Sequence, residues 1–154
     1  MFPQEPAAYA EICGSRKYPE IHGEVKIYHT YGGSILQVQV QGVRDGEGKK
    51  ENRFLGFHIH EGAVCSGNQT DPFADAGGHY NPEDKPHPQH AGDLPPLLLN
   101  DGMAWMMVYT GRFYPEDVIG RTVILHGMAD DFHSQPAGDA GERIACGEIL
   151  AWED

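Results

Sequence analysis

Cysteine, positive charge and long apolar runs are all scarce in this chain of 154 residues. The three cysteines, Cys13, Cys65 and Cys146, form no CxxC pair, which argues against a cysteine-based zinc site or a thioredoxin-like motif. Lys and Arg number 11 against 23 Asp and Glu, and the net charge of −12 argues against nucleic acid and anionic membranes as partners. The apolar runs are too short to span a membrane, so no membrane partner is expected.

The N-terminal stretch MFPQEPAAYAEI has neither the basic start nor the apolar core of a signal peptide. We therefore expect a cytoplasmic protein, with export and prior removal of a leader as the alternative. The length fits one domain, residues 1–154, that is large enough to bury a core.

Three cysteines are most simply one disulfide and one free thiol, and the residues alone do not pair them. Cys13 is expected to be a small buried hydrophobe near the first strand, with an intermolecular disulfide as the minor alternative.

Alternation of apolar and polar residues is the main secondary-structure signal. In GSILQVQVQGV, residues 33–43, Leu36, Val38 and Val40 share one face and the glutamines share the other, which is typical of a half-buried strand. No helical pattern of useful length is present. The chain is therefore predicted to be all-β, a sandwich or barrel of about eight antiparallel strands. The expected strands cover residues 7–13, 23–30, 33–43, 54–61, 103–110, 121–127 and 143–152.

Two long segments interrupt these strands, at residues 62–96 and 127–142. Long loops inside a compact domain are usually functional. The first contains HYNPEDKPHPQHAGD, residues 79–93, with the spacing H-x7-H-x2-H-x2-D. Four nitrogen and oxygen ligands from one loop can close a tetrahedral site, which suits zinc. The alternative is a polar surface loop that happens to be rich in histidine.

The strand FHIH carries His58 and His60 two residues apart, so their side chains point to the same face. His126 ends another predicted strand and can approach the same place across a sheet. Three or four imidazoles without a thiolate indicate copper or zinc. Two partly exposed strand histidines are the alternative for the pair alone. His133 is expected to be a surface histidine rather than a ligand.

Six features in order resemble the copper/zinc superoxide dismutase family, and bacterial members in particular. They are GFHIHEG, Cys65, GGHYNP, AGDLP, LHGMADD and AGERIACGEI, within about residues 20–150. The resemblance implies a Greek-key β-sandwich or flattened barrel with two long functional loops. It also implies an antioxidant enzyme, an oxidoreductase that converts the superoxide anion to dioxygen and hydrogen peroxide with copper and zinc as cofactors.

The resemblance further implies two sets of metal ligands that share one histidine. That histidine, His79, would bridge the metals through its two ring nitrogens and would take up and return a proton during the reaction. The copper set is His58, His60, His79 and His126, and the zinc set is His79, His87, His90 and Asp93.

The resemblance also implies a role for four more residues. Asp130 would hold one ligand histidine of each metal. Arg143, the single cation among seven carboxylates from Gly127 onward, would dock the anion beside copper. Cys65 and Cys146 would form the disulfide.

The chain departs from animal members of the family in both loops. Two residues separate His87 from His90, a shorter spacer, and the loop at 127–142 is shorter and lacks the guiding lysines. We therefore expect little electrostatic steering of the anion from this second loop. The alternative function is a non-catalytic copper- or zinc-binding relative, or a domain that uses zinc only for stability. A homodimer and a monomer are both compatible with the sequence.

Overall fold

A computed structural model describes residues 5–153 of the chain. Its elements are short strands, one short helix and one turn of 3-10 helix at Ala74–Ala76. The helix, α1, covers Pro115–Val118. The strands are β1 (Ala8–Gly14), β2 (His22–Thr30), β3 (Gly33–Gln41), β4 (Phe54–Leu55), β5 (Phe57–His60), β6 (Leu97–Leu98), β7 (Ala104–Thr110), β8 (Thr122–His126) and β9 (Arg143–Ala151).

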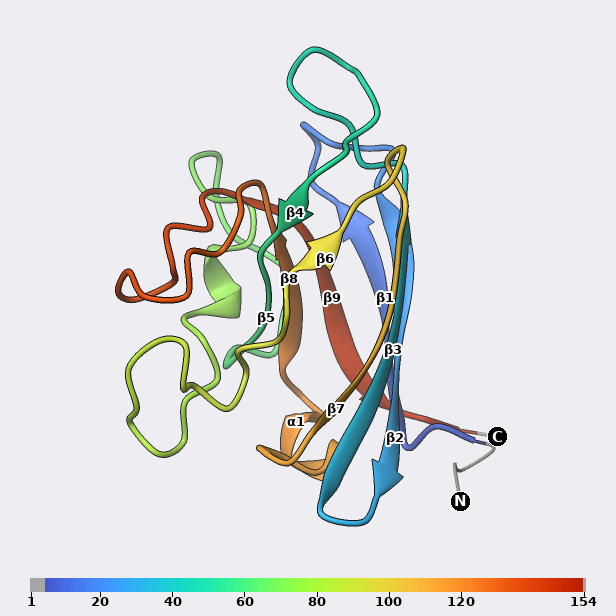
Figure 1. The fold of residues 1–154 in the computed structure, drawn as a ribbon, viewed down its shortest axis with the longest axis vertical. Coiled ribbons are helices and arrows are strands. Elements are labelled where there is room, and N and C mark those ends of the chain that lie inside the picture. Colours follow the sequence, from blue (N-terminus) through green and yellow to red (C-terminus); the bar gives the residue numbers. More distant parts are fainter. Residues whose placement is uncertain (1–4, 154) are drawn as a thin grey trace.

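Seven strands form one curled antiparallel sheet in the order β5-β8-β9-β1-β2-β3-β7 (Figure 1). The remaining two, β4 and β6, pair with each other. Because β4 leads directly into β5 and β6 lies next to β7, this small pair bridges the two edges of the large sheet at one end. The predicted all-β flattened barrel is confirmed. The sequence did not predict β6, which is only two residues long.

The alternating pattern of β3 has the predicted effect. Leu36 and Val38 are fully buried and lie opposite Ile27 and Val25 of β2, so these four side chains meet inside the barrel. Burial of each such side chain stabilises the fold by about 1.5–3 kcal/mol. The β2–β3 hairpin closes at Gly32, whose φ of 81° is a left-handed conformation that glycine adopts without strain.

All four residues of β5 are buried, and each face of the strand has a different neighbour. Phe57 and Ile59 belong to the core inside the barrel. His58 and His60 therefore point to the outer face, where residues of the two long loops contact them and they are buried. These loops lie together on one side of the barrel in Figure 1. Because both faces of β5 are buried, its two histidines are kept away from water.

The first and last long strands, β1 and β9, are neighbours in the sheet. This pairing agrees with the single domain expected for residues 1–154, which stays a prediction. No helix in the described part of the chain is both long and apolar enough to cross a membrane.

Candidate metal centre

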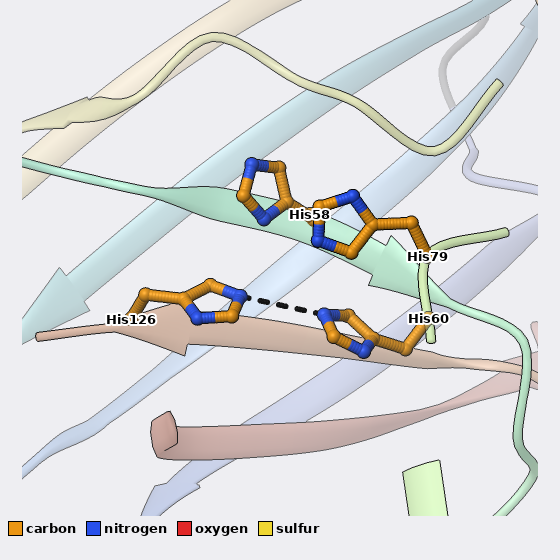
Figure 2. Close-up of side chains that lie close together, drawn as sticks. All are labelled: His58, His60, His79 and His126. Carbon is orange, nitrogen blue, oxygen red and sulfur yellow. Dashed lines mark hydrogen bonds between the residues drawn. The ribbon is translucent and has the colours of Figure 1, made fainter. Parts of the chain in front are cut away.

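Backbone pairing brings together four histidines that are far apart in the sequence. His58 and His60 lie on β5, which pairs with β8, and His126 is the last residue of β8. His79 comes from the first long loop, where an isolated β-bridge pairs its backbone with that of His60. The candidate ligand atoms of the four side chains all lie within 4.8 Å of one another (Figure 2). The structure therefore assembles the four histidines of the expected copper set.

In His60 and His126, a hydrogen bond from Nδ1 to a backbone carbonyl oxygen determines which ring nitrogen carries the proton. His60 Nδ1 donates to the carbonyl oxygen of Gly77 at 2.8 Å, and His126 Nδ1 donates to that of Gly141 at 3.3 Å. A carbonyl oxygen only accepts, so each Nε2 of these neutral rings keeps a lone pair. The two Nε2 atoms nevertheless face each other at 3.3 Å, the contact dashed in Figure 2. Two acceptors at this distance repel, which indicates that a cation belongs between them.

Two further ring nitrogens strengthen this interpretation. His58 Nδ1 and His79 Nε2 are buried and have no hydrogen-bond partner in the described part of the protein. A buried polar atom without a partner costs about 1–3 kcal/mol, so such atoms are rare in folded proteins. In a group of four imidazoles they are suited to bind a copper or zinc ion. The residues present therefore fit the first metal.

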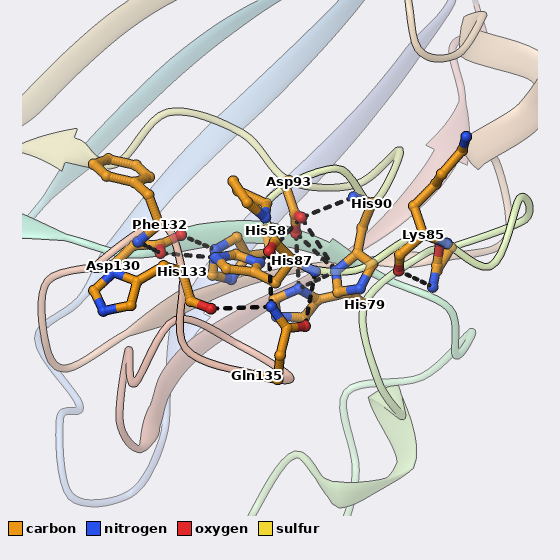
Figure 3. Close-up of polar contacts among 12 residues, drawn as sticks. His58, His79, Lys85, His87, His90, Asp93, Asp130, Phe132, His133 and Gln135 are labelled. Atoms are coloured by element: carbon orange, nitrogen blue, oxygen red, sulfur yellow. Dashed lines mark hydrogen bonds and ion pairs between the residues drawn. The ribbon is translucent and has the colours of Figure 1, made fainter.

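The second group forms around Asp93 (Figure 3). Its Oδ1 lies 2.8 Å from His79 Nδ1, and its Oδ2 lies 3.0 Å from His87 Nδ1. His90 Nδ1 lies 3.1 Å from both His79 Nδ1 and Asp93 Oδ2. The candidate ligand atoms of His58, His79, His87 and Asp93 all lie within 4.8 Å of one another. His90, which the sequence placed in this set in place of His58, contacts it through His79 and Asp93. Three imidazoles and one carboxylate that converge in this way suit zinc.

His79 belongs to both groups and presents a different nitrogen to each. Its Nδ1 contacts Asp93 at 2.8 Å, whereas its Nε2 is the atom without a partner on the other side. One neutral ring cannot offer lone pairs on both nitrogens, so a ring that binds two cations must lose its remaining proton.

Asp130 contacts one histidine of each group, on the side of the ring that faces away from the metal sites. Its Oδ2 accepts the Nε2–H of His58 and its Oδ1 accepts the Nε2–H of His87, both at 2.8 Å. Burial alone would raise the pKa of Asp130, but these two hydrogen bonds outweigh it and hold the pKa well below its ordinary value. The carboxylate is therefore ionised and fixes both rings with Nδ1 facing the metal sites.

Burial keeps the central histidines neutral, which is the form that binds metal ions. It lowers the pKa of His58 and moves the pKa of His60 well below its usual value. The pKa of His126 falls to about 3, mainly by burial and then by repulsion from His58. The expected surface position of His133 is confirmed, because its side chain is 81% exposed.

Arg143 lies at the rim of this centre. Together with His60, His79 and His126 it lines a cleft of about 330 Å³. Its Nη1 donates to the Phe73 carbonyl oxygen at 2.9 Å and its Nη2 to that of Gly77 at 2.7 Å. The guanidinium is thus oriented by backbone groups, and its side chain is 21% exposed to solvent.

Several groups that orient the ligands gave no signal in the sequence. The carbonyl oxygens of Gly77 and Gly141 are backbone atoms, which no residue type identifies. Gln135 holds His87 in place, because its Oε1 accepts the backbone N–H of His87 and its Nε2 donates to the His87 carbonyl oxygen. Gly138 leaves room for the Asp130–His87 contact, because a Cβ there would lie 2.0 Å from Asp130 Oδ1.

The disulfide agrees with the resemblance, whereas the separate expectation for Cys13 does not hold. Cys65 and Cys146 form a disulfide, which confirms that pairing. The expectation that Cys13 is a buried hydrophobe is wrong, because Cys13 is exposed. The alternation of β1 explains this, since Ala10 and Ile12 face the core and the next residue must face outward.

Comparison with known proteins supports this geometry. The family model described as copper/zinc superoxide dismutase matches residues 21–149. A superoxide dismutase [Cu-Zn] of Deinococcus radiodurans is 35% identical, over 77% of this chain and 71% of that protein. One from Aquifex aeolicus is 32% identical, over 96% of this chain and 89% of the relative. The structure resembles that of Cu/Zn superoxide dismutase from Brucella abortus, with a TM-score of 0.76, 28% identity, and coverage of 92% and 98% of the two chains.

Proposed function

The chain belongs to the copper/zinc superoxide dismutase family, and from this premise we infer that it is an oxidoreductase that converts superoxide to dioxygen and hydrogen peroxide. The observation that carries this inference is the pair of buried, unpartnered nitrogens on His58 and His79 within the group of four histidines. Copper and zinc are the cofactors of the family, and both groups of side chains are able to hold them.

We propose that the two groups divide as the sequence suggested. Copper, when bound, supplies a centre that accepts an electron from one superoxide and gives it to another. On the zinc side, Asp93 lies 2.8 Å from His79 Nδ1 and helps to keep that ring in place. The proposed copper ligands are His58, His60, His79 and His126, and the proposed zinc ligands are His79, His87, His90 and Asp93.

The protein's own groups bind the anion and handle a proton. Arg143 is always charged and lines the same cleft as His60 and His126, so it attracts and orients superoxide at the rim. His79 Nε2 faces the copper side and is the ring atom that can hold a proton and deliver it to the reduced product. The two loops exclude bulk water from all four histidine rings, which are at most 9% exposed.

A non-catalytic metal-binding relative is the alternative. It would be favoured by loss of one of the four histidines or of the cation, but all four histidines and Arg143 are present. Three of the histidines, His60, His79 and His126, line one cleft with Arg143. The geometry therefore favours the enzyme.

Reconstitution tests this choice. The metal-free protein is loaded with copper and zinc, metal content is measured, and superoxide decay is followed. We expect dismutation in the loaded protein and none in His126→Ala, with the fold of the variant intact by circular dichroism. Full copper occupancy without dismutation would overturn the enzyme assignment.

Compartment and assembly remain proposals. The Cys65–Cys146 disulfide favours an oxidising compartment, which supports the exported alternative over the cytoplasmic expectation. The homodimer and the monomer both stay open as predictions. The absence of nucleic-acid and membrane partners also stays a prediction.

A further inference from the structure

Cys13 lies directly beside the disulfide rather than at a remote position. In the β1–β9 pairing its Cα is the partner of the Cα of Cys146. Directly opposed residues of antiparallel strands point to the same face and lie about 4.5–5.5 Å apart at Cα. Ala10 and Ile149, which also oppose each other, face the core, so Cys13 and Cys146 share the outer face.

All three cysteines line one cleft. Cys13, Cys65 and Cys146 share an opening of about 330 Å³ on the outer face of β1 and β9. The existing disulfide spans 5.8 Å between its Cα atoms. Disulfides form at Cα separations of about 4.4–6.8 Å, and a directly opposed strand pair falls within this range. Cys146 therefore has two cysteines within bonding reach, one on the loop and one on β1.

We propose that Cys13 is an internal exchange partner of the Cys65–Cys146 disulfide. The Cys13 thiolate attacks Sγ of Cys146 and forms a new S–S bond, and the electron pair of the old bond leaves with Sγ of Cys65, which takes up a proton. One disulfide and one thiol are present before and after, so the step needs neither an oxidant nor a reductant.

The exchange changes which parts of the chain are cross-linked. The Cys65–Cys146 bond ties the first long loop to β9, whereas a Cys13–Cys146 bond joins two strands that are already paired. The loop released in this way contains Phe73 and Gly77, whose carbonyl oxygens orient Arg143. Gly77 also orients His60. In the exchanged form the disulfide no longer ties the loop that orients Arg143 to β9. That this loop supports an anion site rests on the proposed function.

Thiol mapping tests the exchange without reference to activity. The oxidised full-length protein is incubated without added thiol, alkylated with iodoacetamide, digested without reduction and analysed by mass spectrometry. We expect a fraction of chains alkylated at Cys65, and the same fraction to contain a Cys13–Cys146 linked peptide. Cys13→Ser is the control and should show no alkylation at Cys65. Labelling of Cys13 alone in the natural chain, or equal labelling of Cys65 in both proteins, would overturn the proposal.

Dilution separates an internal exchange from one between molecules. The exchanged fraction should stay constant over a hundredfold change in protein concentration and should migrate as a monomer on a non-reducing gel. A fraction that rises with concentration, or that occurs only in cross-linked dimers, contradicts the internal route.

Limited proteolysis tests the predicted effect on the loop. Cys65→Ser should form the Cys13–Cys146 bond on oxidation and lose its free thiols, and its segment 62–77 should be cut several-fold faster than in Cys13→Ser. Two free thiols in oxidised Cys65→Ser, or equal cleavage of the two variants, would contradict the mechanism.

Discussion

Arg143 Nη2 donates a hydrogen bond of 2.7 Å to the carbonyl oxygen of Gly77. The same oxygen accepts the Nδ1–H of His60 at 2.8 Å. One peptide group in the first long loop therefore orients both the cation proposed to dock superoxide and one of the histidines proposed to bind copper. The position of this loop is consequently part of the site, although it contributes no ligand at Gly77.

Two substitutions of Arg143 distinguish the effect of its positive charge from the effect of its planar guanidinium group. Arg143→Ala should lower kcat/KM for superoxide about 10- to 100-fold, since a hydrogen bond to a charged group contributes about 1.5–3 kcal/mol. Arg143→Lys keeps the charge but lacks the planar fork, so its loss should be smaller. Stopped-flow measurement of superoxide decay at matched copper content gives both values. Equal activity of Arg143→Ala and the natural chain would contradict a docking role.

Asp130 is expected to act through the rings that it orients. Asp130→Asn replaces a carboxylate that accepts hydrogen bonds from His58 and His87 at 2.8 Å. Loss of such an outer partner typically lowers metal affinity about 10- to 100-fold. Competition titration with a chelator measures the effect. The matched control is Asp139→Asn, an exposed position in the same loop with the same change of charge, and a comparable loss of affinity there would contradict the proposed role.

The sequence predicted the ligand types, their order and the contact of Asp130 with a histidine of each group, but not the backbone oxygens that orient His60 and His126. The Cys65–Cys146 pairing is confirmed. The side chains of the predicted copper set, His58, His60, His79 and His126, lie together, and those of the predicted zinc set, His79, His87, His90 and Asp93, contact one another. Their roles as ligands stay predictions. The backbone oxygen of Gly77 could not be predicted, because its position depends on loop packing rather than on residue type. Cys13 was misassigned because apolar character alone does not set the face of a strand residue, and the alternation of β1, in which Ala10 and Ile12 face the core, places Cys13 outward.

Lys17 is expected to reduce the repulsion that Glu142 exerts on an anion approaching Arg143. Lys17 and Arg16 line a cleft of about 740 Å³ with Glu142 and Arg143. Lys17 Nζ lies 3.3 Å from Glu142 Oε1, and the Tyr18 hydroxyl donates to the same oxygen at 2.5 Å. The cation thus offsets the carboxylate that directly precedes Arg143 in the chain.

Lys17→Glu should therefore lower kcat/KM several-fold at low ionic strength. The loss should diminish as salt is added, because exposed charges are screened over about 10 Å at 0.1 M. The natural chain should show only a shallow dependence on salt, since the loop at 127–142 carries no lysine. Lys49→Glu is the control, because Lys49 is exposed and lines neither of the two clefts that contain Arg143. An equal salt response of the two variants would contradict a role for Lys17 at the entrance.

The metal-free protein should lose stability as the pH falls below neutrality. His126 has a pKa of about 3 when folded, because it is buried, against about 6.5 when unfolded. The unfolded chain therefore binds more protons between these values, and stability decreases from about pH 6.5 down to about pH 3. Thermal unfolding from pH 7.5 to pH 4 measures the slope. His126→Gln should show a shallower slope and the exposed His133→Gln an unchanged one, so identical slopes in all three proteins would exclude the buried ring as a cause.

Gly138 gives the sharpest test of how closely the second loop must pack on the metal centre. It has a φ of 68°, and a Cβ there would lie 2.0 Å from Asp130 Oδ1 and 2.7 Å from His87 Nε2. Gly138→Ala must therefore displace the carboxylate or the ring. Gly120 has a similar φ of 85°, but a Cβ there meets nothing within 4 Å. Gly120→Ala thus carries the same backbone strain, about 1–2 kcal/mol, without the contact.

Both alanine variants should lower the melting temperature of the metal-free protein, and Gly138→Ala should in addition weaken zinc binding at least tenfold. The difference follows because only Gly138 faces the hydrogen bond that orients His87. Zinc titration of the two variants under one set of conditions decides the question. If both bind zinc as tightly as the natural chain, the Asp130–His87 contact is not needed to hold the site, and the orienting role assigned to Asp130 would have to rest on His58 alone.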